Sequence, residues 1–172
     1  MDYQITNWIY GMHNAFSDPI FKIITYSGNL MLIWIIITLV LLIKTKKLNV
    51  KSIIYLNIIP IVLSLFNEYG LKTIIERKRP FIQYEKFVPL IMPPHGSSMP
   101  SGHSLSSFLM ATILSYYFPK YKIPLYILAT MISLSRVYVG VHYFSDVLVG
   151  SALGVIFAII YLKILKRYTV KI

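Results

Sequence analysis

The chain has 172 residues, a length that accommodates one domain and excludes two of ordinary size. Hydrophobic residues make up 56% of it and the mean hydropathy is +0.66, which excludes an ordinary soluble fold and indicates a membrane protein. A net charge of +11 would suggest nucleic-acid binding in a soluble protein, but here the basic residues gather between apolar runs, so we expect no nucleic-acid partner. The sequence has no cysteine, which excludes disulfides and thiolate sites.

The first part of the chain predicts a segment that lies along the membrane surface. Residues 2–16 alternate aromatic and aliphatic side chains with polar ones, which is typical of a short interfacial helix with Trp8 at headgroup level. A frayed terminus is the alternative interpretation. We assign residues 1–18 to this interfacial segment, because Asp18-Pro19 indicates a turn and the start of the next helix.

Five long uncharged runs follow, and they predict an all-α integral membrane bundle of about five transmembrane helices that forms a single domain, residues 1–172. The runs are Ile23–Ile43, Ser52–Asn67, Ser104–Pro119, Ile123–Ser135 and Val147–Leu162. A spanning helix needs about 20 apolar residues, so the shorter runs have to extend into their polar flanks. The second run can reach Leu71 if Glu68 faces the protein interior, and Arg136 cuts the fourth run short.

The distribution of charge predicts how these helices cross the membrane. Ten of the seventeen basic residues fall in three places that share one side if the helices alternate in direction, namely residues 44–51, 120–122 and 163–171. An excess of basic residues in short loops marks the cytoplasmic face. The carboxyl terminus is therefore expected in the cytoplasm, whereas residues 72–103 and 136–146 are expected on the extracytoplasmic face.

Residues 80–100 hold five prolines and show little periodicity, which predicts an extracytoplasmic loop. Loops of this length in a compact domain are usually functional or disordered. His95 lies inside the loop, where a lone histidine is most simply solvated.

Two glycines in the last apolar run predict close contact between helices. Gly150 and Gly154 are four residues apart, the spacing that lets two helix backbones approach each other. We expect this pair to serve packing inside the bundle rather than dimerisation.

The second run closes with basic side chains whose spacing suits an anion. In KTIIERKRP, residues 72–80, Lys72 and Arg79 are seven residues apart, about two helical turns, so we expect both to point the same way before Pro80 ends the helix. A phosphate dianion is held by fixed cations and by backbone N–H groups that cannot relax away. Snorkelling to lipid headgroups is the alternative, although four cations at an outer helix end oppose the usual cytoplasmic bias.

The sequence PSGH, residues 100–103, stands directly before the third run. Ser101 suits a helix N-cap, Gly102 lets a ligand approach the backbone, and a helix N-terminus attracts anions. A plain cap explains Ser-Gly equally well. His103, at the membrane edge, is harder to explain as part of a cap and can donate a proton to a leaving oxygen.

The third segment, SRVYVGVHYFSD at residues 135–146, carries a histidine and an acid four residues apart. His142 and Asp146 share a face if the last helix begins near residue 142. A carboxylate bonded to one imidazole nitrogen fixes the tautomer and leaves the other nitrogen free to attack. Arg136 is close enough in sequence to bind the same phosphate. A structural His–Asp pair is the alternative for this segment taken alone.

Together the segments have the pattern Lys, six residues, Arg-Pro; then Pro-Ser-Gly-His; then Ser-Arg, five residues, His, three residues, Asp. This ordered set, which covers roughly residues 19–165, resembles the type 2 phosphatidic acid phosphatase superfamily, which also includes vanadium haloperoxidases and bacterial acid phosphatases. The resemblance implies a hydrolase that uses neither a metal ion nor another cofactor. Membrane members of the family commonly have six spans, whereas this chain is expected to lack the first and to start with the interfacial segment.

The resemblance also implies a role for each matching residue. His142 would be the nucleophile that forms a phosphohistidine, Asp146 would orient it, and His103 would protonate the leaving group. The residues that would hold the phosphate and its transition-state charge are Lys72, Arg79, Ser101, Gly102 and Arg136.

The sequence therefore predicts an integral membrane lipid phosphatase at the outer leaflet, surrounded by membrane lipids and acting on a lipid phosphate or diphosphate. Undecaprenyl diphosphate, a cell-wall carrier, is the first candidate substrate; phosphatidylglycerophosphate and phosphatidic acid are the alternatives. A vanadium haloperoxidase is disfavoured because those proteins are typically soluble. A non-enzymatic headgroup receptor would need the cations but not two histidines and an acid, and a proton-coupled transporter would place His and Asp at mid-span.

Overall fold

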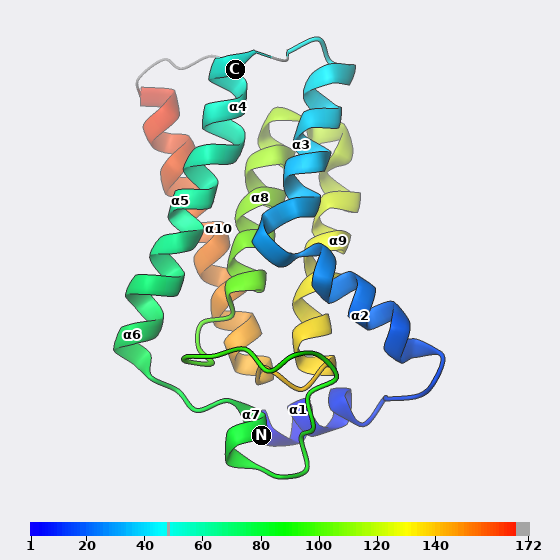
Figure 1. The fold of residues 1–172 in the computed structure, drawn as a ribbon. Coiled ribbons are helices and arrows are strands. Elements are labelled where there is room, and N and C mark those ends of the chain that lie inside the picture. Colours follow the sequence, from blue (N-terminus) through cyan, green and yellow to red (C-terminus); the bar gives the residue numbers. More distant parts are fainter. Residues whose placement is uncertain (48, 168–172) are drawn as a thin grey trace.

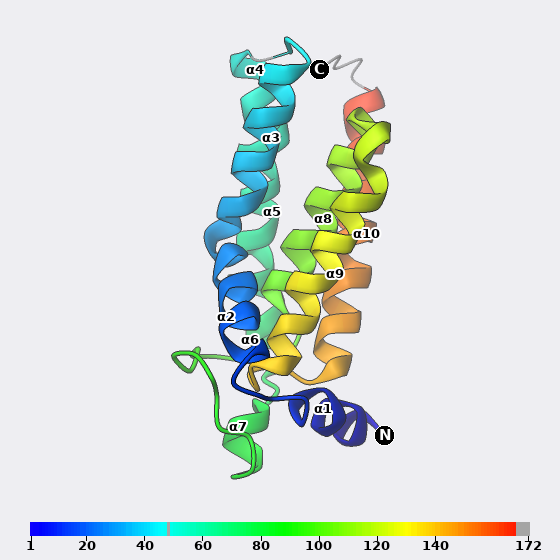
Figure 2. The same ribbon diagram turned by 90° about the vertical axis from the view of Figure 1, so that its right-hand side faces the viewer.

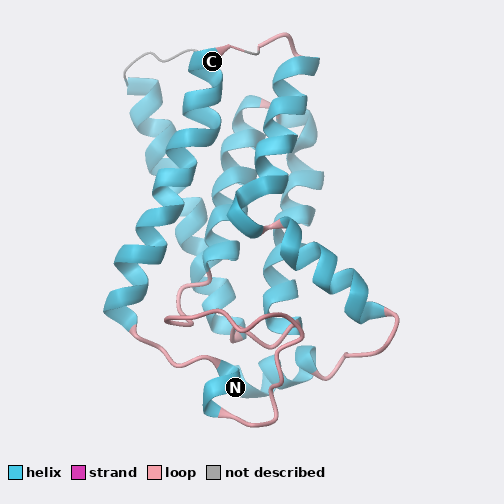
Figure 3. Ribbon diagram, in the orientation of Figure 1, coloured by secondary structure: helices cyan, strands magenta, loops and turns pink. Residues whose placement is uncertain are grey.

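The computed structural model describes residues 1–47 and 49–167, and over these residues it is a helical bundle without strands (Figure 1; Figure 3). The α-helices are α1 (Asp2–Tyr10), α2 (Ser17–Ser27), α3 (Leu32–Lys44), α4 (Val50–Ile53), α5 (Ile59–Phe66), α6 (Lys72–Ile75), α7 (Pro80–Gln83), α8 (Gly102–Tyr117), α9 (Lys122–Tyr138) and α10 (Phe144–Arg167). Short 3₁₀ or π turns join several of them: η1 (Asn29–Met31), η2 (Ile54–Ile58), η3 (Asn67–Leu71) and η4 (Pro119–Tyr121). The all-α fold expected from the sequence is confirmed.

Two helical stretches among the described residues are by themselves long and apolar enough to cross a membrane. They are Val50–Gln83, which contains α4 to α7, and α10. The bent pair α2 and α3, which meet at 67°, gives a third if the pair is taken as one span. Helix α8 has 16 residues and α9 has 17, fewer than the roughly 20 of a typical span, yet both stand alongside α10 in the bundle (Figure 2). For these two helices the predicted crossing stays a prediction.

Helix α8 lies inside the bundle, packed against α9 and α10 and also against α5 (Figure 2). Its buried side chains Leu109, Ile113 and Leu114 share one core cluster with Trp34 of α3. The Trp34 indole N–H donates to Ser107 Oγ at 3.2 Å, so the large ring is fixed in direction as well as buried. The helix that carries PSGH at its start is therefore held on several sides.

Helix α10 approaches α8 closely at two glycines. A Cβ on Gly150 would lie 2.6 Å from Ser101 O, and one on Gly154 would collide with Leu105 O. The predicted role of this glycine pair in packing inside the bundle is confirmed. The close approach also joins the two helix starts, because Ser101 N donates to Asp146 O at 3.1 Å.

The three motifs lie at one end of the bundle. This end gathers α1, α7, the start of α8 and the turn between α9 and α10, whereas the turns after α3 and α8 and the far end of α10 lie at the other (Figure 1). The basic clusters near residues 44–47, 120–122 and 163–167 are therefore opposite the motifs. This is the separation that the charge distribution predicted.

Between Lys72 and Arg79 the chain does not form the continuous helix that the sequence predicted. Helix α6 ends at Ile75, and Glu76 takes a left-handed conformation with φ 46°. Arg79 is extended, with φ −75° and ψ 157°, because the residue before a proline disfavours the helical region. Pro80 therefore does not end the preceding helix but begins α7, a single turn inside the predicted loop.

Candidate active site

A cavity of about 540 Å³ opens where the three motifs meet. Its lining residues are Asn29, Glu68, Lys72, Arg79, Pro94, His95, Gly102, His103, Arg136 and His142. Six of the eight predicted site residues thus face one space, and the imidazoles of His103 and His142 open into it together. The other two, Ser101 and Asp146, are fully buried.

His142 lies in the turn between α9 and α10 with its two ring nitrogens in different surroundings. Helix α10 begins only at Phe144, but the turn still brings His142 Nδ1 within 3.4 Å of Asp146 Oδ2. On the other side of the ring, Arg79 Nη1 lies 3.3 Å from Nε2. A guanidinium can only donate, so Nε2 carries a lone pair and the proton is on Nδ1, facing Asp146.

Burial also keeps this imidazole uncharged. It lowers the pKa of His142 to about 3; Asp146 opposes the shift, and the positive charges of Arg79 and Arg136 add to it. At neutral pH the ring is therefore a neutral base with its lone pair on Nε2, the form that a nucleophile requires.

Both carboxylate oxygens of Asp146 are fixed by neighbouring donors. Oδ2 accepts the backbone N–H of Tyr143 at 2.8 Å and the hydroxyl of Ser98, and Oδ1 accepts from Arg77 Nη1 at 2.6 Å. A carboxylate held on both oxygens keeps its orientation and so fixes its histidine partner. Ser98 lies outside the motifs and has no signal in the sequence, and Arg77 is one of the four cations for which the alternative was snorkelling to lipid headgroups.

Arg79 uses all five of its N–H groups. Nε and Nη2 donate to the carbonyls of residues 95–97 at 3.0 to 3.1 Å. Nη1 donates to Val141 O at 3.0 Å and reaches His142 Nε2 with its second hydrogen. Arg79 thereby holds the proline-rich loop against the turn before α10 and places one charged donor beside Nε2 of His142.

Arg136, in the last turn of α9, is buried, and not all of its N–H groups have an acceptor in the part of the chain that the structure describes. Its Nη1 donates to Thr25 Oγ1 at 2.6 Å, whereas Nε is buried and has no hydrogen-bond partner among the described residues. A buried guanidinium N–H without an acceptor is costly. Because Arg136 also lines the cavity, this donor suits an oxygen of an anionic ligand.

Lys72 is paired with an acid that the sequence did not place in the site. Its Nζ donates to both carboxylate oxygens of Glu68, each at 2.7 Å. The Glu68 side chain is 45% exposed and lines the cavity. The helical stretch Val50–Gln83 continues past it, as the sequence analysis required for the second run. A Cβ on Gly102 would lie 3.1 Å from Glu68 Oε2, so this carboxylate occupies an anion position between Lys72 and the start of α8.

His103 is held by the bend between α2 and α3. Its Nε2 lies 2.9 Å from Asn29 Oδ1, and since an amide oxygen only accepts, Nε2 carries the proton. The ring packs so tightly on the bend that a Cβ on Gly28 would lie 2.8 Å from His103 Cδ2. Neither Gly28 nor Asn29 belongs to a motif, so only the structure connects them with the site.

Ser101 is the N-cap of α8, as its position predicted. Its Oγ accepts the backbone N–H of Ser104 at 3.4 Å and the Ser104 hydroxyl at 3.0 Å. Gly102 is the first helical residue and lines the cavity. The first turn of α8, whose N–H groups have no partner within the helix, therefore meets the cavity at Gly102.

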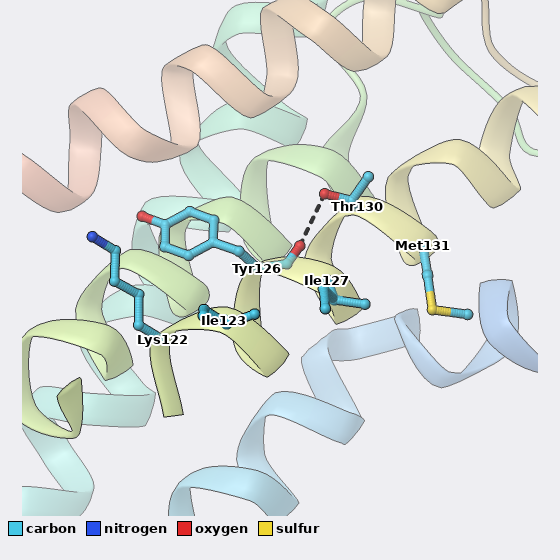
Figure 4. A pocket seen from close by; sticks show the side chains of 6 residues that line it. All are labelled: Lys122, Ile123, Tyr126, Ile127, Thr130 and Met131. Carbon is cyan, nitrogen blue, oxygen red and sulfur yellow. Dashed lines mark hydrogen bonds between the residues drawn. The ribbon is translucent and has the colours of Figure 1, made fainter. Parts of the chain in front are cut away.

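A separate hollow of about 450 Å³ lies on the first half of α9 (Figure 4). It is lined by Lys122, Ile123, Tyr126, Ile127, Thr130 and Met131. Ile123 and Ile127 are 72% and 55% exposed, as expected where a helix face meets acyl chains. It contains no motif residue and lies toward the end of α9 that is opposite Arg136, so it is not part of the site.

Comparison with known proteins agrees with this geometry. The family model of the PAP2 superfamily matches residues 52–169, which hold all three motifs. The chain belongs to the PAP2 superfamily. This is the family that the three motifs resemble, and its lipid phosphatases are among the most similar curated proteins.

Three relatives of this PAP2 protein are curated phosphatases. The undecaprenyl-diphosphatase of Sulfolobus acidocaldarius is 34% identical over 157 residues, which cover 81% of this chain and 74% of that protein. Phosphatidylglycerophosphatase B of Bacillus subtilis is 37% identical over 99 residues, and lipid A 1-phosphatase of Rhizobium johnstonii is 35% identical over 94 residues. The chain spans only 45% and 38% of the length of these last two.

Solved structures show the same fold. The transmembrane PAP2 type phosphatidylglycerolphosphate phosphatase from Bacillus subtilis has a TM-score of 0.76 at 23% identity and covers 99% of this chain and 86% of its own. LpxE of Aquifex aeolicus has a TM-score of 0.74 at 31% identity, with 94% of each chain covered. This PAP2 protein is therefore a helical membrane protein and a lipid phosphatase, as the sequence predicted.

The carboxylate of Glu68 is expected to compete with bound anions. Glu68→Gln should lower the inhibition constant of orthovanadate about two- to fivefold, because the buried Lys72 loses the half-exposed carboxylate that competes with a bound anion. The measurement is the inhibition constant of the purified protein in detergent. Glu76→Gln removes an exposed acid one turn beyond Lys72 and should leave the constant unchanged. An unchanged constant in Glu68→Gln would mean that Lys72 does not meet the bound anion.

The lack of a side chain at Gly28 is expected to be needed for catalysis. Gly28→Ala should lower kcat about 100-fold, because its Cβ would lie 2.8 Å from both the His103 ring and the Ile132 side chain and would displace the imidazole. Gly70→Ala is the matched control, since its Cβ would meet only the Phe66 ring, at 3.3 Å. Steady-state kinetics and thermal unfolding of both variants make the comparison. Equal kcat values for the two variants would contradict the assigned position of His103.

Proposed function

We propose that this protein hydrolyses a lipid phosphate or diphosphate at the extracytoplasmic leaflet through a phosphohistidine on His142. The observation that carries the proposal is the convergence of a nucleophile, a proton donor and three cations on one cavity. They are His142, His103, Lys72, Arg79 and Arg136. Such a site can provide a bound phosphate with the nucleophile, the proton donor and the positive charges that covalent phosphoryl transfer requires.

In the first step the lone pair of His142 Nε2 attacks phosphorus, and the bond from phosphorus to the leaving oxygen breaks. Arg79 shifts its hydrogen bond from Nε2 to a phosphoryl oxygen as the lone pair is used. His103 passes a proton to the leaving oxygen, and the negative charge of the bound phosphate favours the imidazolium form that this requires. Lys72 and the unpaired Nε of Arg136 stabilise the charge on the phosphoryl oxygens.

In the second step water attacks the phosphorus of the phosphohistidine. His103, now neutral, takes a proton from the water, and the bond between phosphorus and Nε2 breaks. Inorganic phosphate leaves and His142 returns to its neutral form. Asp146 holds the Nδ1 proton throughout and stabilises the positive charge that the ring carries while it is phosphorylated.

Undecaprenyl diphosphate is the substrate that we propose first. The main support is the likeness to an undecaprenyl-diphosphatase, which extends over 81% of this chain. A diphosphate also suits the local shape, because a second hollow of about 460 Å³ shares Glu68 and Lys72 with the site cavity and adds Lys78. The leaving group would then be a lipid monophosphate, which needs less help from His103 than an alkoxide.

Phosphatidylglycerophosphate is the second candidate. It is favoured by the 37% identity with phosphatidylglycerophosphatase B, over half of this chain. Phosphatidic acid presents the same phosphate monoester chemistry and completes the set of alternatives. A monoester would use the site cavity alone and would depend more strongly on proton transfer from His103.

We place the site on the extracytoplasmic face and the carboxyl terminus in the cytoplasm. The support is the gathering of basic residues at the end of the bundle opposite the motifs. In this arrangement residues 1–18 are the interfacial segment and residues 80–100 the extracytoplasmic loop of one domain, residues 1–172. A lipid phosphate at headgroup level can then enter the cavity while its tail stays in the bilayer.

The test is phosphate release by the purified protein in detergent and excess chelator. The panel contains undecaprenyl diphosphate, undecaprenyl phosphate, phosphatidylglycerophosphate and phosphatidic acid, each assayed with wild type and with His142→Ala. We expect the highest kcat/KM for the diphosphate and no release by the variant. A higher value for another lipid would replace the proposed substrate, and a strict need for a divalent metal would overturn the mechanism.

A further inference from the structure

We propose that Asp2 and Arg77 are positioning residues for the reaction. Asp2, on α1, holds Arg77, and Arg77 holds the carboxylate of Asp146 that orients His142. The proposal rests on the nucleophilic role proposed above for His142. Neither Asp2 nor Arg77 lines the site cavity, although Arg77 lines the neighbouring hollow of about 460 Å³. With a phosphate monoester, which would use the site cavity alone, any effect that the two residues have on catalysis has to pass through Asp146.

The guanidinium of Arg77 joins α1 to α10 as a fork. Its Nη1 donates to Asp146 Oδ1 at 2.6 Å and to Ser145 Oγ at 2.7 Å, and its Nη2 donates to Asp2 Oδ2 at 2.7 Å. The same group lies over the ring of Tyr143, with Cζ 4.0 Å from the ring centre. These four contacts leave the guanidinium one position and one orientation.

Helix α1 supplies hydrogen-bond acceptors for the first N–H groups of α10. The first N–H groups of a helix have no acceptor within it. In α10 the N–H of Phe144 donates to Thr6 Oγ1 at 3.0 Å, and that of Ser145 donates to Asp2 Oδ1 at 2.9 Å. The Ser145 hydroxyl donates to the other oxygen of Asp2, at 2.5 Å. The turn of α10 that carries Asp146 is therefore anchored directly by α1.

The charges in this cluster depend on one another. Asp146 is fully buried, whereas Asp2 and Arg77 are 30% and 28% exposed. A buried carboxylate without a compensating charge is strongly unfavourable, and Arg77 provides that charge. Burial raises the pKa of Asp2, but hydrogen bonds from Ser145 and Arg77 outweigh it, so the pKa lies below its usual value and Asp2 stays ionised at neutral pH.

Only a planar fork can serve both acids at once. Arginine presents donors in fixed directions, whereas the ammonium of lysine is a point charge at the end of a flexible chain. A lysine at position 77 could approach Asp2 or Asp146 but could not hold both in place. Arg77→Lys therefore keeps the positive charge at position 77 and removes the planar arrangement of donors.

The experiment compares Asp2→Asn, Arg77→Lys and the double variant with wild type, using hydrolysis of a lipid phosphate monoester and thermal unfolding. We expect each single variant to lower kcat about tenfold, with KM and the orthovanadate inhibition constant within about twofold of wild type. In the Arg77→Lys background, Asp2→Asn should lower kcat by less than about twofold, because the contact between Asp2 and the guanidinium is already lost. Arg77→Gln, which lacks the charge as well, should lose more activity than Arg77→Lys.

Asp18→Asn is the matched control. Asp18 also anchors the N-terminal segment, through Tyr138 Oη at 2.7 Å and His13 Nδ1 at 3.0 Å, but it does not contact Asp146. It should lower the unfolding temperature and leave kcat unchanged. Losses in Asp2→Asn and Arg77→Lys that multiply, or unfolding shifts with unchanged kcat, would overturn the proposal. Turnover that persists in His142→Ala would instead overturn the proposed function.

Discussion

Replacing His142 with alanine is expected to lower turnover of a lipid phosphate by at least about 10⁴-fold, because the covalent step loses the imidazole nitrogen that attacks phosphorus. The trapped intermediate gives the second measurement. Wild-type protein mixed with ³²P-labelled substrate and denatured in alkali should retain covalently bound label. Acid treatment should release this label, because a phosphorus–nitrogen bond is stable in alkali and labile in acid. The variant should retain none, while orthovanadate still protects it against thermal unfolding.

His13→Ala is the control for this experiment. His13 is the histidine that does not line the cavity, and it pairs with Asp18 at 3.0 Å. Its replacement should leave both turnover and labelling unchanged. Appreciable turnover in His142→Ala, or label that is stable in acid and attached to another residue, would assign the nucleophile elsewhere.

Replacing His103 with alanine is expected to produce a loss that depends on the leaving group. Hydrolysis of a lipid monoester should fall about 10³-fold, whereas hydrolysis of p-nitrophenyl phosphate should fall less than about tenfold, because general acid catalysis matters most for strongly basic leaving oxygens. The measurement is kcat/KM over a series of phosphate esters with graded leaving-group pKa. A plot of log kcat/KM against leaving-group pKa should have a steeper slope for the variant than for wild type.

The activated esters serve as an internal control, since they test folding and phosphate binding in the same preparation. Asn29→Ala provides a second comparison, because it keeps the imidazole and removes the amide that orients Nε2. Its slope should lie between the other two. Equal losses across the whole series would show that His103 binds or supports the phosphate and does not donate the proton.

The motifs predicted which side chains meet, but not how the chain brings them together. Lys72 and Arg79 line one cavity, yet the helix expected between them stops at Ile75. The spacing of seven residues fits two helical turns, so periodicity favoured a continuous helix. The restriction that Pro80 places on Arg79 is local and visible in the sequence, whereas the left-handed turn at Glu76 depends on what surrounds it.

Several residues of the site have no sequence signal at all. Asn29, Ser98 and Glu68 contact His103, Asp146 and Lys72 through the fold alone. Each is a common polar residue outside the three motifs. A hydrogen bond between residues far apart in sequence depends on distances that only packing sets. The pairing of Arg77 with Asp2 and Asp146 belongs to the same class, since adjacent basic residues look alike as charges.

By itself the sequence determined the class of this protein, because hydropathy, charge placement and the three motifs each record a local requirement: apolar length for a helix, basic loops for an orientation, and particular side chains for a phosphate. Tertiary structure alone decided which donors have no partner within the described part of the chain, as at Arg136 Nε, and which are engaged, as on Arg79. Those outcomes arise from close packing, in which the two glycines of α10 and Gly28 set how near the helices come. The residue types determine which groups can react, and packing determines the distances between those groups.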